Sequence, residues 1–191
     1  MFWNLPTLLT WARIVAIPLI VGVFYLPLPQ TDINVWACGL FVVVAFTDWL
    51  DGWLARRLNQ TSSFGAFLDP VADKFLVCAS LLILLEVDRV NAVVALIIIG
   101  REIAISALRE WMAQIGASRS VAVHMLGKLK TAAQMAAITL LLYHGDLGVV
   151  GLPFDAAQLG TWLIYIACGL TIWSMAYYLR KSIPDIVARA R

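Results

Sequence analysis

Long apolar runs separated by short polar breaks make up most of the chain. Six of these runs have the length and composition of helices that cross a lipid bilayer. They lie at residues 8–26, 34–57, 67–87, 90–111, 128–144 and 158–180. The breaks between them are rich in proline, glycine, asparagine, aspartate and serine, which favour turns. The pattern predicts an all-α, polytopic membrane protein with six transmembrane helices.

The composition indicates the same class of protein. Hydrophobic residues make up 62% of the 191 residues and charged residues only 14%, and a soluble core of this size could not bury so much apolar surface. No loop is long enough for a second domain, so we expect residues 1–191 to form a single domain. The net charge of +2 gives no reason to expect a nucleic-acid partner.

Basic residues indicate how the chain is oriented. With a cytoplasmic N-terminus and six spans, the loops assigned to the outside contain one basic residue, Arg89, and the inside ends of the helices receive most of the lysines and arginines. Basic residues favour the cytoplasmic side of a membrane protein. We therefore expect the polar chemistry of the chain to face the cytoplasm, close to the lipid headgroups.

The densest polar chemistry lies between residues 48 and 73, at the ends of two apolar runs. Asp48 and Asp51 are three residues apart, and Asp69 and Asp73 are four apart. Either spacing places both carboxylates on one face of a helix. If the polar connection 57–63 joins two antiparallel helices, the four carboxylates face each other across a small gap. Such a group repels itself unless cations lie within it, and hard divalent cations prefer oxygen ligands.

Residues that follow the first pair of acids suit a phosphate ligand. Gly52 leaves room for close approach of a ligand or of a neighbouring backbone. Arg56 can bind a diphosphate with two parallel hydrogen bonds. Arg57 is interpreted as an ordinary basic flank on the cytoplasmic side.

Polar residues near the N-terminus allow two interpretations. Asn4 and Thr7 suit the start of the first helix as capping residues, and they could instead contact a ligand at the same depth. Arg13 is interpreted as an anchor that reaches the headgroups, and Lys74 as another such anchor that points away from the acids.

The fourth apolar run contains Arg101 and Glu102 directly after a very apolar segment. A charge at that depth is costly and is usually functional or paired inside a bundle. Arg109 lies eight residues after Arg101, loosely on the same helix face. Glu102 and Glu110 are candidate structural partners for these cations.

Further basic residues follow in the segment that leads to the fifth run, namely Arg119, Lys128 and Lys130. Two lysines that are two residues apart point in different directions on a helix. At most one of them would therefore share a face with Arg101.

The central stretch resembles the signature of a known family. It reads DxxDGxxAR, eight residues, G, three residues, D, three residues, D, and its eight identities are Asp48, Asp51, Gly52, Ala55, Arg56, Gly65, Asp69 and Asp73. This is the full signature of the CDP-alcohol phosphatidyltransferase family. The flanking segments NLPTLLTWAR, REIAISALREW and GKLKTAAQM resemble the bacterial inner-membrane members that use glycerol 3-phosphate.

The resemblance implies a chemistry for the central stretch. In this family the four aspartates bind two divalent metal ions, Mg²⁺ or Mn²⁺, and the last aspartate, here Asp73, is also the general base. Gly52 and Arg56 would contact the CDP part of CDP-diacylglycerol. The reaction would join CDP-diacylglycerol to sn-glycerol 3-phosphate, and the family is generally homodimeric.

An acceptor that carries its own phosphate needs a cationic pocket beside the metal ions. The candidates in this chain are Arg101, Arg109, Arg119, Lys128 and Lys130, among which we favour Arg101 and Lys130.

Three other functions stay open at this point. Within the family, a cardiolipin synthase would use phosphatidylglycerol as the acceptor. A divalent-cation transporter could line a pathway with the same acids, although transporters place ligands near the middle of the bilayer and these acids lie at one face. A structural membrane protein would pair the acids with arginines.

Overall fold

Six α-helices follow the apolar runs of the sequence, in a computed structural model that describes residues 5–58, 63–114, 125–147 and 155–189. The helices are α1 Leu5–Gly22, α2 Gln30–Leu58, α3 Ser63–Glu86, α4 Ala92–Gln114, α5 Met125–Tyr143 and α6 Ala156–Arg189, with a short 3₁₀ turn, η1 Val23–Tyr25, after α1. The prediction of an all-α fold is confirmed, and the described residues contain no β-strand.

The helix boundaries differ from the predicted ones in two informative places. α3 begins at Ser63, four residues earlier than predicted, so Pro70 lies inside the helix and not in its first turn. Proline cannot donate the backbone hydrogen bond that an interior position of a helix normally makes. α6 continues to Arg189, well past the predicted end at residue 180, and runs through Pro184.

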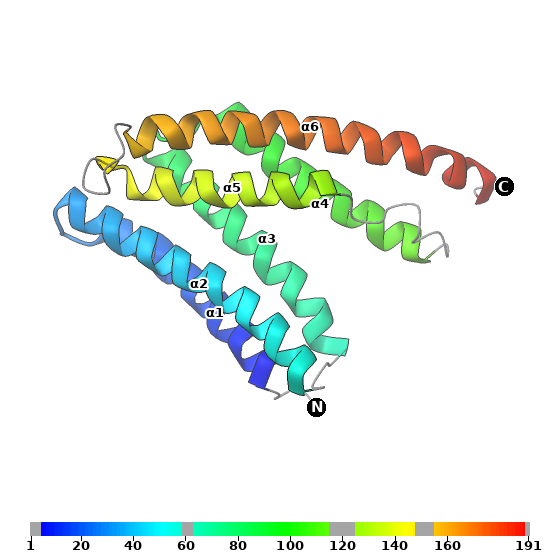
Figure 1. Cartoon of the computed structure of the whole chain (residues 1–191), viewed down its shortest axis with the longest axis horizontal. Helices are drawn as coiled ribbons and strands as arrows, with labels where there is room; N and C mark the ends of the chain where they lie inside the picture. Colours follow the sequence, from blue (N-terminus) through cyan, green and yellow to red (C-terminus); the bar gives the residue numbers. More distant parts are fainter. Residues whose placement is uncertain (1–4, 59–62, 115–124, 148–154, 190–191) are drawn as a thin grey trace.

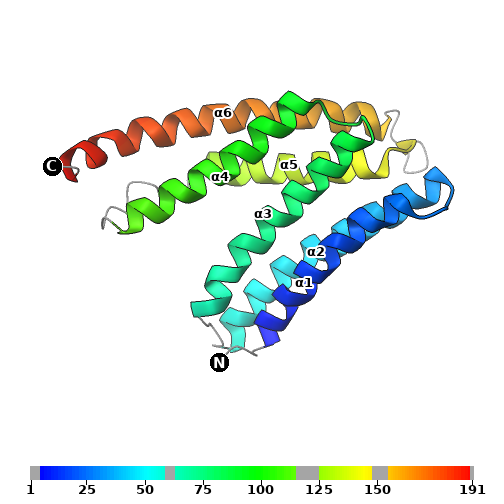
Figure 2. The same ribbon diagram turned by 180° about the vertical axis from the view of Figure 1, so that it is seen from behind.

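The helices associate as neighbouring pairs. Figures 1 and 2 both show α1 and α2 side by side as a hairpin, α5 and α6 side by side, and α3 crossing between these pairs. α1 also packs on α3, α6 on α4, and α2 on α5. The start of α1, the end of α2 and the start of α3 meet near the N-terminus (Figure 1), and this end carries the predicted aspartates.

A continuous apolar core runs through all six helices, with Ile164 as its member from α6, and further apolar side chains face outward. Ile17, Phe41, Leu81, Ile98 and Ile138 represent α1 to α5 in this core and are at most 1% exposed. Large apolar side chains on the outside are mostly exposed, for example those of Val15, Val43, Leu96, Trp162 and Trp173. An apolar exterior around an apolar core is stable in lipid and not in water.

Three helical segments are long and apolar enough to cross a membrane: Thr7–Tyr25, Gln30–Asp48 and Ala156–Arg180. Leu129–Tyr143 is apolar but shorter. Charged residues interrupt the apolar sequences of α3 and α4, so neither helix contains an apolar segment of comparable length. The chain is therefore a membrane protein, and the count of six spans stays a prediction.

Arg89 links the connection between α3 and α4 to α5, α2 and η1, at the end of the bundle opposite the aspartates. It lies between α3 and α4 and donates hydrogen bonds to the backbone oxygens of Leu141 (3.0 Å) and Leu142 (3.1 Å) and to Asn34 Oδ1 (2.7 Å). The last carbonyls of a helix have no partner within the helix. Arg89 thus caps α5 and ties it to α2, and its guanidinium lies 5.9 Å from the Phe24 ring centre.

Close packing of α6 on α5 depends on Gly160. A Cβ atom at this position would lie 2.9 Å from Leu141 Cγ and 3.1 Å from the Leu141 backbone nitrogen. Gly169, on the same helix, has open space around the corresponding position. The two glycines therefore provide a matched test of this packing.

We predict that Gly160→Ala costs about 1–3 kcal/mol of stability, because the helices must move apart to admit the methyl group. Thermal unfolding of the protein in detergent should show a midpoint lower by roughly 2–10 °C. Gly169→Ala should leave the midpoint unchanged or raise it slightly. Equal midpoints for the two variants would contradict the close contact between α5 and α6.

Candidate active site

Three helices bring predicted aspartates to a common cation. Asp48 belongs to α2 and Asp73 to α3, and Arg13 of α1 reaches both. Arg13 Nη1 lies 2.7 Å from Asp48 Oδ1 and 2.7 Å from Asp73 Oδ1. Two carboxylates from different helices therefore converge on one positively charged nitrogen.

Arg13 is more deeply buried than the two aspartates that it binds. The side chain of Arg13 is fully buried, whereas those of Asp48 and Asp73 are 43% and 51% exposed. A buried guanidinium is stable only when it is paired, so the interpretation of Arg13 as a headgroup anchor is wrong. Its apolar surroundings in the sequence suggested lipid, but the residue faces the interior of the bundle.

A polar stripe on α1 faces the same acids. Thr7, Thr10 and Arg13 recur every three residues and are all buried, at 2%, 1% and 1% exposure. Thr10 Oγ1 donates a 2.7 Å hydrogen bond to Asp69 Oδ1. Sequence reasoning missed Thr10, although polar residues at this spacing in an apolar helix were a usable signal. Because α1 already includes Leu5, Thr7 lies within the helix and the prediction that it caps the start is wrong.

Several residues of the predicted site lie outside the described part of the chain. These are Asn4 and Arg119, and the side chains of Asp51, Gly52, Arg56 and Lys128. Their predicted roles stay predictions.

The described aspartates suit a hard cation in their chemistry. Asp48, Asp69 and Asp73 offer oxygen atoms alone, the donors that Mg²⁺ and Mn²⁺ prefer, and two of them already converge on the charge of Arg13. Among the described side chains, which exclude Asp51, no three His, Cys, Asp or Glu residues lie close enough to hold a metal ion. The oxygen donors are of the kind that a divalent cation prefers, and the predicted metal site stays a prediction.

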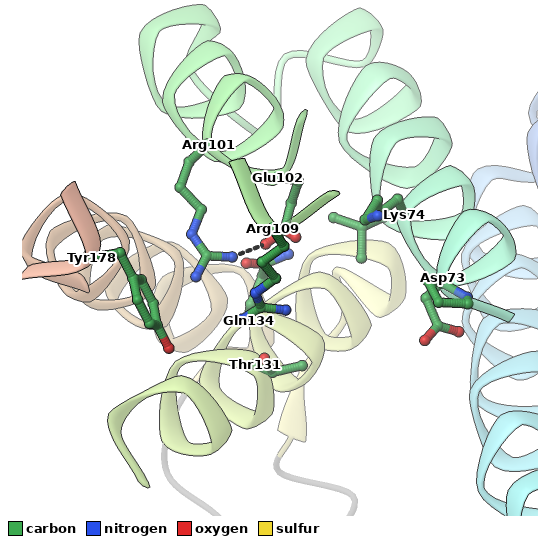
Figure 3. Close-up of a pocket in the computed structure, with 10 residues that line it drawn as sticks. Asp73, Lys74, Arg101, Glu102, Arg109, Thr131, Gln134 and Tyr178 are labelled. Carbon is green, nitrogen blue, oxygen red and sulfur yellow. Dashed lines mark hydrogen bonds and ion pairs between the residues drawn. The ribbon is translucent and has the colours of Figure 1, made fainter. Parts of the chain in front are cut away.

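Asp73 also lines a cavity of about 290 Å³ between α3, α4, α5 and α6. Figure 3 shows its wall, to which α3 contributes Asp73 and Lys74, α4 contributes Arg101, Glu102 and Arg109, α5 contributes Thr131 and Gln134, and α6 contributes Tyr178. Lys74 therefore lines the cavity, and its interpretation as a headgroup anchor stays a prediction. Asp73 lies toward one end of the cavity, and Arg101 and Arg109 lie toward the other (Figure 3).

The basic end is built around one carboxylate. Glu102 Oε1 accepts hydrogen bonds from Arg101 Nη1 (2.8 Å) and from Lys130 Nζ (2.6 Å). Arg101 is 8% exposed and Lys130 is 1% exposed. Two cations that share one anion leave an excess positive charge, and Arg109 adds another, with its guanidinium 5.8 Å from the Tyr178 ring centre. The structure confirms Glu102 as a partner of these cations.

The predicted basic residues differ in how they reach the cavity. Among the described ones, Arg101 and Arg109 line its wall. Lys130 is buried beside it and acts on the cavity through Glu102. Sequence reasoning missed Gln134 and Tyr178, since single polar side chains in apolar helices give no periodic signal.

Comparison with known proteins agrees with this geometry. Residues 3–173 match the CDP-alcohol phosphatidyltransferase family. Relatives from Shigella flexneri serotype 5b (strain 8401) and Escherichia coli (strain K12) are each 46% identical over 189 residues, covering 98% of this chain and 99% of the relative. Both carry the name CDP-diacylglycerol–glycerol-3-phosphate 3-phosphatidyltransferase. The spacing of the aspartates, the site they form and these matches agree, and the chain belongs to the CDP-alcohol phosphatidyltransferase family.

Proposed function

We propose that this protein transfers the phosphatidyl group of CDP-diacylglycerol to sn-glycerol 3-phosphate, giving phosphatidylglycerophosphate and CMP, a step in the synthesis of anionic phospholipids. One observation carries the proposal: Asp73 shares Arg13 with Asp48, and it also lines a cavity whose other end is cationic. A base and an anion-binding surface thus share one cavity. The relatives named for this reaction match nearly the whole chain.

On the acceptor side, Asp73 takes the proton from the terminal hydroxyl of glycerol 3-phosphate. The hydroxyl oxygen then forms a bond to the phosphorus that bears the diacylglycerol, and the bond from that phosphorus to CMP breaks. Arg101 and Arg109 bind the phosphate of the acceptor, since guanidinium groups match phosphate oxygens. Glu102 and Lys130 hold Arg101 in place, and Arg119 and Lys128 are further candidates for phosphate contacts.

On the donor side, Asp48, Asp51, Asp69 and Asp73 would hold two divalent ions, Mg²⁺ or Mn²⁺. Such ions, when bound, neutralise the diphosphate and the charge that develops on the leaving CMP. Gly52 and Arg56 would contact the CDP group, with Asn4 and Thr7 nearby. The buried side chains of Arg13 and Thr10 fix the orientation of Asp48, Asp69 and Asp73 through their polar contacts.

The membrane setting belongs to the same proposal. Six spans in a bacterial inner membrane would place this site at the cytoplasmic face, where glycerol 3-phosphate can enter and the acyl chains of the donor remain in lipid. The dense basic charge at the predicted inside ends supports that orientation. A homodimer, as is general in the family, would be the working form.

The direct test is CMP release by the purified protein in detergent, with CDP-diacylglycerol, Mg²⁺ and one added acceptor. We expect release with glycerol 3-phosphate and none after removal of divalent ions with EDTA, followed by recovery on adding excess Mg²⁺. Release that requires phosphatidylglycerol would instead identify a cardiolipin synthase. Absence of release with every acceptor, from folded protein, would overturn the proposal.

The role of Asp73 as the base can be tested with Asp73→Asn. The amide keeps the shape of the side chain and an oxygen that can face Arg13, but it cannot accept the proton. We expect the turnover number to fall by about 10²–10⁴-fold with little change in the unfolding midpoint. Asp88→Asn, in the connection at the opposite end of the bundle, is the matched control and should retain full turnover. Wild-type turnover by Asp73→Asn would remove Asp73 from this role.

The role of Arg101 in acceptor binding can be tested with Arg101→Lys. Lysine keeps a positive charge next to Glu102 but loses the planar fork of donors. We predict that the KM for glycerol 3-phosphate rises by about 10–100-fold, the change expected for one charged hydrogen bond, while the KM for CDP-diacylglycerol stays the same. Arg180→Lys, at an exposed position of α6, serves as the control. An unchanged KM for the acceptor in Arg101→Lys would be the contrary result.

A further inference from the structure

Two residues that line the cavity each carry a buried polar atom that has no hydrogen-bond partner among the described residues. The atoms are Arg101 Nε, a donor, and Gln134 Oε1, an acceptor. Arg101 is 8% exposed and Gln134 only 2% exposed, so bulk water does not solvate either side chain freely. A buried polar group without a partner is costly, and its presence in a binding cavity indicates a group that the ligand supplies.

The two atoms need different hydrogen-bonding groups from a ligand. The Nε–H of Arg101 needs an acceptor, and phosphate oxygens are acceptors in abundance. The amide of Gln134 needs a group that can donate to its oxygen. A hydroxyl both donates and accepts, so it can pair with either edge of a side-chain amide.

Glycerol 3-phosphate carries one more hydroxyl than the reaction uses. Its phosphate matches Arg101 and Arg109, and its terminal hydroxyl must face Asp73. The secondary hydroxyl on the middle carbon is then left between these two ends. Figure 3 shows Gln134 on α5 between Asp73 and Tyr178 in this view, on the same cavity wall.

We propose that Gln134 is a specificity-determining residue that binds the secondary hydroxyl of the acceptor alcohol. The inference rests on the proposed function and adds to it the group by which the enzyme recognises a glycerol backbone. Neighbouring side chains are less suited to this role. Tyr178 packs against the guanidinium of Arg109, and the exposed Thr131 already has a polar interaction.

The proposal is tested by comparing two acceptors that differ in one group. Glycerol 3-phosphate and 3-hydroxypropyl phosphate share the phosphate and the reacting terminal hydroxyl, and only the former has the secondary hydroxyl. CMP release gives kcat/KM for each. We expect wild-type protein to favour glycerol 3-phosphate by about 100-fold or more, since a site built to bind a hydroxyl rejects an analogue that lacks it.

The variant Gln134→Met keeps the length of the side chain and removes its polar atoms. Its kcat/KM for glycerol 3-phosphate should fall by about 10–100-fold, while the value for 3-hydroxypropyl phosphate stays within about threefold of wild type. The preference for glycerol 3-phosphate therefore falls by about the same factor. Gln158→Met, the same change on α6 away from this cavity, should keep the wild-type preference.

The outcomes distinguish failure of the proposed function from failure of the role of Gln134. No CMP release by wild-type protein with either acceptor would overturn the proposed function and this inference together. Equal use of both acceptors by wild-type protein would overturn the inference alone, without any variant. A parallel loss with both acceptors in Gln134→Met would assign Gln134 a packing role and would also overturn the inference.

Discussion

The buried guanidinium of Arg13 is the interaction on which the site depends. It lies inside an apolar bundle, where an unpaired charge is not tolerated, and its partners come from two other helices. Satisfying this charge therefore requires α1, α2 and α3 to meet at one place. The acids are held at that place, half exposed, while their countercharge stays beneath them.

Buried charges are also paired at the other end of the cavity, but with the signs reversed. In the first cluster one cation serves two carboxylates, and in the second one carboxylate, Glu102, serves two cations. The first cluster is therefore short of positive charge and the second is short of negative charge. A ligand pair that brings cations to one end and a phosphate to the other satisfies both imbalances.

The sequence predicted the parts of this site that repeat a spacing. Asp48, Asp69 and Asp73 stand out because their intervals match helix geometry, and Arg101 stands out as a charge within an apolar run. Arg13 was misassigned, because a basic residue near a helix end looks the same in sequence whether it faces lipid or its own bundle. Gln134 gave no signal, since a lone amide acquires meaning only from the cavity around it.

For the helices as well, the sequence predicted some features and missed others. The apolar runs predicted all six helices, because burial and hydrogen bonding in lipid leave few alternatives. The third apolar run predicted a helix from residue 67, but α3 begins at Ser63. Packing of α3 on α1 supports this extra length, and that packing is invisible in a single sequence.

Every described residue with a proposed chemical role belongs to a helix: Asp48 to α2, Asp69 and Asp73 to α3, Arg101 and Arg109 to α4, and Lys130 and Gln134 to α5. The distance between the base and the bound acceptor is consequently a property of how rigid helices pack. None of these described residues lies in a connection between helices. The outward-facing apolar side chains can therefore change to suit another membrane while the reacting groups keep their relative positions.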